Sequence, residues 1–279
     1  MAGITAFLSC PETKVLFISV TTIHNVLLMV ERKEELSERG KEIIRQQGGV
    51  QNMVWVLQNF KTNHKLLAIV ADCLRILSMQ SPLTKQIFLE CKGPQLLVEI
   101  MQTQDYKNLI LMTSRLLKVL SVCPHNKQAI IGAGGIDAIA KHLGSPCNKT
   151  KLHCVWALRN LSDAANNIGN LQGLVRSLVE LLREPDIQLV ICSAGIIFNL
   201  TCNNQRNKLA VFNSGGLQVA TSRHHSFEFG DPIILVIRCD SDSTFQALVY
   251  VMRRNGGNTH LLDPSISALR HLTNNHEQA

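Results

Sequence analysis

Apolar and polar positions follow a helical period along the chain, and one local pattern recurs six times. Each copy is an apolar run with a polar or basic residue at a fixed place, as in "DCLRILS", "RLLKVLS" and "IIFNLTC". Because side chains three and four positions apart share one face of a helix, each copy predicts a helix with an apolar stripe and a polar mark. The marked positions are Asn25, Arg75, Lys118, Asn160, Asn199 and His271.

The spacing of these marks indicates an internal repeat. Successive marks lie 50, 43, 42, 39 and 72 residues apart, and the middle three fall in or next to the period of about 40–47 residues typical of armadillo and HEAT repeats. Glycines at 48–49, 93, 134–135, 173 and 215–216 precede new apolar helices in phase with the marks, where glycine allows a sharp turn. The expected units of a single array are 1–47, 48–92, 93–133, 134–171, 172–214 and 215–279.

Two spacings are too long for one repeat. The first is absorbed by the charged segment Met29–Ile44, and the last falls to 44 residues when 219–246 is removed. The segment 219–246 has no helical period and contains the strand-like run "IILVI". We expect an insertion between the helices of one repeat, and the pattern leaves open whether it is a hairpin, a disordered excursion or a transcript artefact.

Composition narrows the class of protein. The chain is 46% hydrophobic but only 5% aromatic, which favours helices over sheets. A net charge of +7 without a long basic run indicates an acidic partner rather than a polybasic tail. The nine cysteines are odd in number and form no CxxC pair, so we expect buried thiols in a reducing compartment. Neither a signal peptide at "MAGITAFLSCPETK" nor a membrane-spanning run is expected.

One stretch, "WALRNLSDA", places Trp156, Arg159 and Asn160 on the same face of a predicted helix. An amide offers two donors and one acceptor to an extended peptide backbone, and cations between such amides attract acidic side chains. The plainer alternatives are an asparagine that bonds to a neighbouring turn and a tryptophan that belongs to the core. "WVLQN" has the same Trp/Asn spacing but is out of phase with the repeat, so we interpret it as a coincidence.

Several longer motifs resemble the armadillo region of the β-catenin and plakoglobin family. They are "WALRNLSDAA", "NLTCNNQRNK", "TSRLLKVLSVC" and "ALRHLT", supported by "KTNHKLLAI" and "AGGIDAIAKHL". The resemblance covers nearly the whole chain outside Met29–Ile44 and 219–246. It implies an all-α, right-handed superhelical solenoid of about six armadillo repeats, with no enzymatic activity, no cofactor and no metal site.

The resemblance also implies a positively charged groove that binds extended acidic peptides. Lys85 and Lys208 resemble the family's two charge-pairing lysines, and Asn160, Asn199 and Asn203 resemble the asparagines that bind ligand backbone. Leu111 and Met79 depart from the family pattern, which has Trp and Tyr there. The other matching groove positions are Phe17, His24, Asn25, Lys65, Arg115, Lys118, Trp156, Arg159, Arg270 and His271.

The implied partners are the cadherin cytoplasmic tail, T-cell factor, axin and the adenomatous polyposis coli protein. The implied roles are Wnt signalling, transcriptional coactivation and cell–cell adhesion, in cytoplasm and nucleus with a pool at cell–cell junctions. An adhesion-specialised, plakoglobin-like catenin is the nearest alternative, and a nucleic-acid-binding helical solenoid is a more distant one. The cations in the marked column favour an acidic ligand over the basic peptides that importin-α holds. No nucleotide-binding, hydrolase or metalloprotease motif supports an enzyme.

Overall fold

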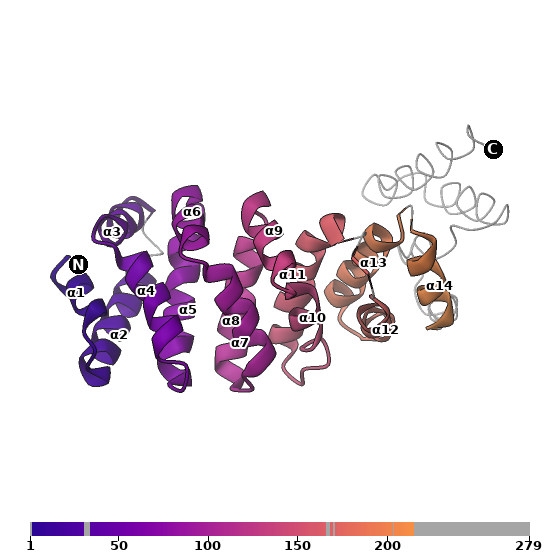
Figure 1. Cartoon of the computed structure of the whole chain (residues 1–279), viewed down its shortest axis with the longest axis horizontal. Helices are drawn as coiled ribbons and strands as arrows, with labels where there is room; N and C mark the ends of the chain where they lie inside the picture. Colours follow the sequence, from indigo (N-terminus) through magenta and orange to yellow (C-terminus); the bar gives the residue numbers. More distant parts are fainter. Residues whose placement is uncertain (1, 31–33, 166–167, 170, 203, 215–279) are drawn as a thin grey trace. The chain divides into compact units, whose positions relative to one another are not determined.

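The computed structural model describes residues 2–30, 34–165, 168–169, 171–202 and 204–214. Every regular element in these ranges is a helix, as the periodicity predicts (Figure 1). The elements are α1 (Ala2–Ala6), a short 3-10 helix (Phe7–Ser9), α2 (Thr13–Val30), α3 (Glu34–Gln46), α4 (Gly49–Asn59), α5 (His64–Ser78), α6 (Pro82–Glu90), α7 (Gly93–Thr103), α8 (Lys107–Leu120), α9 (Pro124–Gly132), α10 (Gly135–Ala140), α11 (Asn148–Ala165), α12 (Gln172–Leu181), α13 (Ile187–Thr201) and α14 (Gln205–Asn213).

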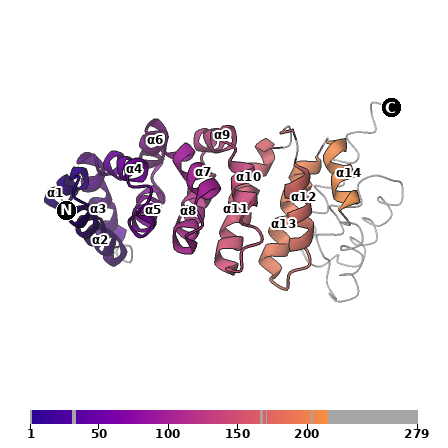
Figure 2. The ribbon, with the colours of Figure 1, turned by 60° about the horizontal axis from the view of Figure 1, so that its bottom comes forward.

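The chain divides into two compact bodies, 1–161 and 162–279, with the boundary inside α11. In the N-terminal body, the long helices α2, α5 and α8 pack side by side in one row (Figure 2), and Trp156 of α11 lies beside Lys118 of α8; we call these four helices the long-helix row. A second layer contains α4, α6, α7, α9 and α10, which pack on one another and on the row. Leu74 of α5 and Leu117 of α8 are fully buried, so the apolar stripes form the core.

The same helix order recurs within the predicted units. The range 48–92 contains α4, the long α5 and the short α6, and the range 93–133 contains α7, the long α8 and the short α9. In the C-terminal body, α12, α13 and α14 pack on one another, with Asp186 capping the N-terminus of α13. Because each repeat contains one long helix, equivalent side chains of these helices recur once per repeat and form columns across them.

Two of the turns between repeats depend on a left-handed backbone. Gly48 has a φ of 68° and Gly134 a φ of 82°, and both directly precede a second-layer helix. Lys92 occupies the corresponding position before α7 with a φ of 57°, although it has a side chain. Gly173 does not serve this purpose, because it is the second residue of α12 and its backbone is not left-handed.

The glycine after each of these turns is required by close packing. A Cβ atom on Gly135 would lie 2.4 Å from Cγ2 of Ile130, five residues earlier, and 2.6 Å from its carbonyl oxygen. Gly49 and Gly93 make the same kind of close approach to the residue five positions before them. The three glycines let a short helix and the following helix meet at van der Waals distance, which no larger residue permits.

Candidate functional site

Asp72 lies at the centre of a charged cluster that joins three helices of the long-helix row. Its Oδ2 atom is 2.9 Å from Nε2 of His24 on α2. Its Oδ1 atom accepts hydrogen bonds from Nε of Arg75 at 2.6 Å and from Nη1 of Arg115 on α8 at 3.1 Å. We call these four residues the Asp72 cluster. They bring together two predicted site residues, His24 and Arg115, around a carboxylate that the sequence analysis did not identify.

The Asp72 cluster is mostly shielded from water. The side chain of Asp72 is 8% exposed, that of Arg75 is 9% exposed and that of Arg115 is 32% exposed. Burial alone would raise the pKa of the Asp72 carboxyl, but the hydrogen bonds from His24 and Arg75 and the nearby guanidinium charges lower this pKa well below its usual range. Asp72 is therefore ionised at neutral pH and ties consecutive repeats together.

A second cluster surrounds an indole ring further along the row. Nζ of Lys118 on α8 lies 5.1 Å from the ring centroid of Trp156 on α11, and Cζ of Arg159 lies 5.8 Å from the same centroid. The half-buried indole thus lies within cation–π range of two cations. We call these three residues the indole cluster. The predicted grouping of Trp156 with Arg159 is present, and Lys118 joins it from the preceding repeat.

The half-buried His153 on α11 reports the positive field around this cluster. Desolvation lowers its pKa, and the charges of Lys118, Arg115, Arg75 and Lys149 lower it further, to about 4. A neutral imidazole at physiological pH follows directly. The field that keeps a proton away from His153 attracts carboxylates to the same surface.

The asparagines of the predicted site bond across repeats. Nδ2 of Asn160 donates to Oγ of Ser121 at 3.0 Å and to the carbonyl oxygen of Lys118 at 3.3 Å. In the C-terminal body, Nδ2 of Asn199 donates to Oγ of Ser162 at 2.8 Å. Bonding to a neighbouring repeat, which is the plainer alternative for these asparagines, is therefore present for the amide nitrogens.

These bonds correct the register of the predicted column. Because Asn160 bonds to Ser121 and Asn199 bonds to Ser162, the two serines occupy equivalent positions in consecutive repeats. The equivalent of Asn160 in α8 is then Val119, two residues before Ser121, and not Lys118. Lys118 is instead equivalent to Arg159, and Arg75 lies 43 residues before Lys118, so the predicted column is shifted by one residue at both Arg75 and Lys118.

Contacts between neighbouring long helices support the corrected register. His24 contacts Asp72 of the next repeat, and Lys118 contacts Trp156 of the next repeat. Both contacts follow if His24, Arg75, Lys118 and Arg159 form one column. The second column then contains Asp72, Arg115 and Trp156, and the spacings of 43 and 41 residues in it match those from Arg75 to Lys118 and from Lys118 to Arg159.

The corrected register also explains an unpaired hydroxyl. Ser78 is equivalent to Ser121, and its fully buried Oγ atom has no hydrogen-bond partner among the described residues. The helix that follows offers Val119 at the place where α11 offers Asn160 to Ser121. The serine position is common to the repeats, but the amide that satisfies it is not.

The remaining predicted residues are more dispersed. On α2, Phe17 is half-buried and Asn25 is exposed, and Lys65 is exposed at the start of α5. Lys85 lies on α6, in the second layer, where its carbonyl oxygen accepts a hydrogen bond from Nδ2 of Asn126 at 3.1 Å. Among the described residues, no hydrogen bond or ion pair joins the side chains of these four residues to either cluster.

Several predictions lie outside what the structure describes. Asn203, Arg270, His271 and the insertion 219–246 lie outside the described residues, and Lys208 is described only as part of the helix α14. Of the two departures from the family pattern, Met79 has a clear contact, because its sulfur lies 3.0 Å from Nη1 of Arg75. A methionine at this position thus extends the surroundings of the Asp72 cluster.

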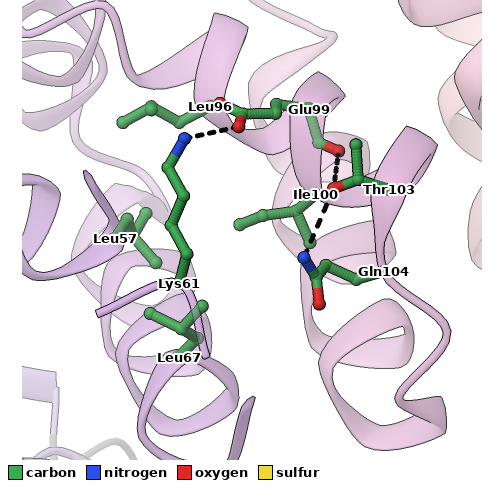
Figure 3. A pocket seen from close by; sticks show the side chains of 8 residues that line it. All are labelled: Leu57, Lys61, Leu67, Leu96, Glu99, Ile100, Thr103 and Gln104. Carbon is green, nitrogen blue, oxygen red and sulfur yellow. Dashed lines mark hydrogen bonds and ion pairs between the residues drawn. The ribbon is translucent and has the colours of Figure 1, made fainter. Parts of the chain in front are cut away.

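A shallow cleft lies in the N-terminal body between the end of α4, the start of α5 and α7 (Figure 3). Leu57, Leu67 and Ile100 line it, and an ion pair between Lys61 and Glu99 crosses it. None of the predicted site residues lines this cleft. It therefore does not form part of the candidate site.

The cysteines and the helix lengths add two further observations. The eight cysteines in the described ranges are free thiols, but only Cys73, Cys154 and Cys192 are buried, so the expectation of generally buried thiols is only partly met. Among the described residues, no helix has the length and apolar character to cross a membrane.

Comparison with known proteins defines the class. Residues 123–163 match the armadillo/β-catenin-like repeat family. A solved structure from a study of a phosphorylation switch in the interaction between cadherin and β-catenin aligns with 98% of this chain and 47% of its own, with a TM-score of 0.73 and 32% identity. The chain is an armadillo-repeat protein, and the predicted all-α armadillo fold is confirmed.

The sequence relatives make the assignment more specific. Over 272 residues, or 98% of this chain, the sequence is 41% identical to catenin beta of Urechis caupo and 38% identical to human junction plakoglobin. The resemblance to the β-catenin and plakoglobin family is confirmed. The chain spans about a third of the length of these relatives, 29% and 32% respectively.

Proposed function

We propose that this chain is a non-catalytic scaffold whose long-helix row binds extended acidic segments of other proteins. The partners in this proposal are cadherin cytoplasmic tails, T-cell factor, axin and the adenomatous polyposis coli protein. Such segments are disordered when free and cover a long track when bound, which suits a surface that repeats at regular intervals. The relationship to β-catenin and plakoglobin supports this choice of partners.

The observation that carries the proposal is the indole cluster. Lys118 and Arg159 both lie within cation–π range of a half-buried tryptophan, and desolvation together with nearby cations, Lys118 first among them, lowers the pKa of the neighbouring His153. An indole face offers apolar contact area, while the two cations offer charge-assisted hydrogen bonds to a carboxylate. An acidic peptide with an apolar side chain beside the acid satisfies both features.

The roles that follow are cell–cell adhesion and Wnt signalling with transcriptional coactivation. The corresponding locations are cytoplasm and nucleus, with a pool at cell–cell junctions. An adhesion-specialised role is the second candidate, because human junction plakoglobin is among the relatives that match 98% of the chain. Calorimetry with a cadherin-tail peptide and a T-cell-factor peptide separates the two, since an adhesion specialist prefers the former.

Removal of one charge from the indole cluster tests the proposal. Lys118→Gln should weaken the binding of an acidic cadherin-tail peptide by about 1–2 kcal/mol, which is the scale of one charge-assisted bond. The matched control is Lys61→Gln, which removes the same charge beside the cleft that contains none of the predicted residues. Isothermal titration calorimetry should show a loss for Lys118→Gln and near-unchanged affinity for the control. Equal affinities of wild type and Lys118→Gln would refute the assignment.

A further inference from the structure

We propose that Asp72 is an internal acidic competitor that directs the carboxylates of a bound partner away from its own cluster and toward the indole cluster. This inference rests on the proposed function, because it specifies where along the long-helix row an acidic segment places its charges. It assigns a specificity-determining role to a residue that the sequence motifs do not mark.

The geometry shows how Asp72 competes. Its carboxylate already contacts Arg75 of its own helix α5, His24 of α2 and Arg115 of α8. Arg115 is the most exposed of these partners, at 32%, so it is the cation that an incoming peptide meets. A carboxylate that approaches Arg115 also approaches Asp72, and repulsion between the two acids offsets part of the attraction.

The indole cluster lacks this competition at its central cation. Nζ of Lys118 faces the ring of Trp156, and no carboxylate within the described ranges pairs with it. An aromatic face stabilises a cation by about 0.5–2 kcal/mol and carries no net negative charge that would repel an acid. The charge of Lys118 therefore attracts an incoming carboxylate in full. The charge of Arg115 attracts it less, because Asp72 already pairs with that guanidinium.

The two clusters also occupy equivalent columns, which makes the contrast direct. Asp72 and Trp156 lie at corresponding positions of different repeats, each beside a cation of the neighbouring column. At the first position, the aspartate pairs with the neighbouring cation. At the second, the aromatic ring leaves the neighbouring cation available to a carboxylate of the partner. We expect the peptide to present neutral hydrogen-bonding or apolar residues at the Asp72 cluster and acidic residues at the indole cluster.

The experiment is a charge-neutralising substitution, Asp72→Asn, in the full chain. Asparagine keeps an oxygen for Arg75 and Arg115 but removes the competing charge. The probe is a fluorescein-labelled glutamate-rich peptide, with its glutamine counterpart as the uncharged control, measured by fluorescence anisotropy. Asp105→Asn is the matched variant, because it makes the same change in net charge at a 90% exposed side chain that lies 3.8 Å from Nζ of Lys141 and belongs to neither cluster.

We expect Asp72→Asn to tighten the glutamate peptide by roughly threefold to fivefold, the scale of one partly exposed charge pair. Asp105→Asn and the glutamine peptide should show little change. In the Asp72→Asn background, Arg115→Gln should remove the gain. A folded Asp72→Asn protein with unchanged or weaker binding overturns the inference, and so does a gain that persists without Arg115.

A second comparison in the wild-type background does not depend on the folding of Asp72→Asn. Arg115→Gln should weaken the glutamate peptide less than Lys118→Gln, because Asp72 already occupies Arg115. A larger loss for Arg115→Gln overturns the inference. If Lys118→Gln leaves the affinity for the glutamate peptide unchanged, the proposed function itself fails. If Lys118→Gln weakens this affinity but Asp72→Asn does not raise it, only the role of Asp72 is refuted.

Discussion

Two serines at equivalent positions of consecutive repeats should respond in opposite directions to the same substitution. Ser78 and Ser121 are both fully buried, but they differ in their partners. The hydroxyl of Ser121 accepts a hydrogen bond from Asn160 and donates one to the carbonyl oxygen of Lys118, each at 3.0 Å. The hydroxyl of Ser78 has no partner among the described residues. We therefore expect Ser121→Ala to destabilise the protein and Ser78→Ala to leave its stability unchanged or raised.

The magnitudes follow from these contacts. Loss of the Ser121 hydroxyl removes two hydrogen bonds and leaves an amide hydrogen of Asn160 with a worse partner, at a cost of about 1–2 kcal/mol. An unsatisfied buried hydroxyl costs about 1–3 kcal/mol relative to a paired one, so removal of the Ser78 hydroxyl should gain up to about 1 kcal/mol after the small loss of packing. The two substitutions should thus differ by roughly 1–3 kcal/mol in the free energy of unfolding.

Urea denaturation followed by circular dichroism measures this difference. At constant m-value, the midpoint should fall for Ser121→Ala and stay unchanged or rise for Ser78→Ala, because neither change alters the surface exposed on unfolding. A double-mutant cycle of Ser121→Ala with Asn160→Ala should show a coupling of about 0.5–1.5 kcal/mol. Equal destabilisation by Ser78→Ala and Ser121→Ala would show that Ser78 has a partner, and the corrected register would then be wrong.

Two further predictions concern acid stability and glycine packing. The pKa of His153 is about 4 in the folded protein, below its usual value near 6.5, so the unfolded chain takes up a proton first as the pH falls. The free energy of unfolding should therefore decrease by about 1–2 kcal/mol between pH 6.5 and pH 4, after allowance for solvent screening. Urea titrations at several pH values measure this dependence. Above about pH 5, where few carboxylates titrate, His153→Gln should lose most of it. Gly135→Ala should lower the free energy of unfolding by about 1–3 kcal/mol because the added Cβ meets Ile130, whereas Gly173→Ala, with nothing within 4 Å, should be neutral or stabilising by up to about 1 kcal/mol. Similar thermal denaturation curves for the two glycine variants would contradict the packing argument.

The helices and the repeat could be predicted from the sequence because both depend on local periodicity. Apolar residues at helical spacing fix which face of α8 is buried, and the glycines at 48–49 and 134–135 mark turns whose backbone only glycine adopts easily. At Gly173, the residue type alone leads to a wrong prediction of a turn that requires glycine. The residue type is the same, but neither its φ nor its surroundings require glycine.

The register of the polar column needed contacts that the sequence does not contain. Arg75, Lys118 and Asn160 are all polar residues followed by an aliphatic one, so an alignment by residue type places them together. The hydrogen bond from Asn160 to Ser121 shows that Lys118 belongs to the adjacent position. A serine three residues after each of Arg75, Lys118 and Arg159 was the signal that could have revealed this register.

Asp72 was missed for a related physical reason. A single acid within the apolar run "ADCLRIL" has the appearance of a solvated side chain, and nothing nearby in sequence except Arg75 suggests a partner. Its other partners, His24 and Arg115, are 48 and 43 residues away, and only the packing of three long helices brings them together. Long-range ion pairs of this kind are set by tertiary structure rather than by local pattern.

The identity of one residue per repeat decides how the long-helix row presents its charge. Within the described residues, the column of Asp72, Arg115 and Trp156 lies beside the column of His24, Arg75, Lys118 and Arg159, so the helices repeat while the side chain in the first column varies. With an aspartate, the carboxylate pairs with Arg75 and Arg115 inside the protein, and these contacts lower the pKa of that carboxyl despite its burial. With a tryptophan, Lys118 lies over an aromatic face that carries no net negative charge, and its charge adds to desolvation in lowering the pKa of His153. An acidic partner therefore has a defined position along an otherwise repetitive surface, because its carboxylates are attracted where the aromatic residue stands and repelled where the aspartate stands.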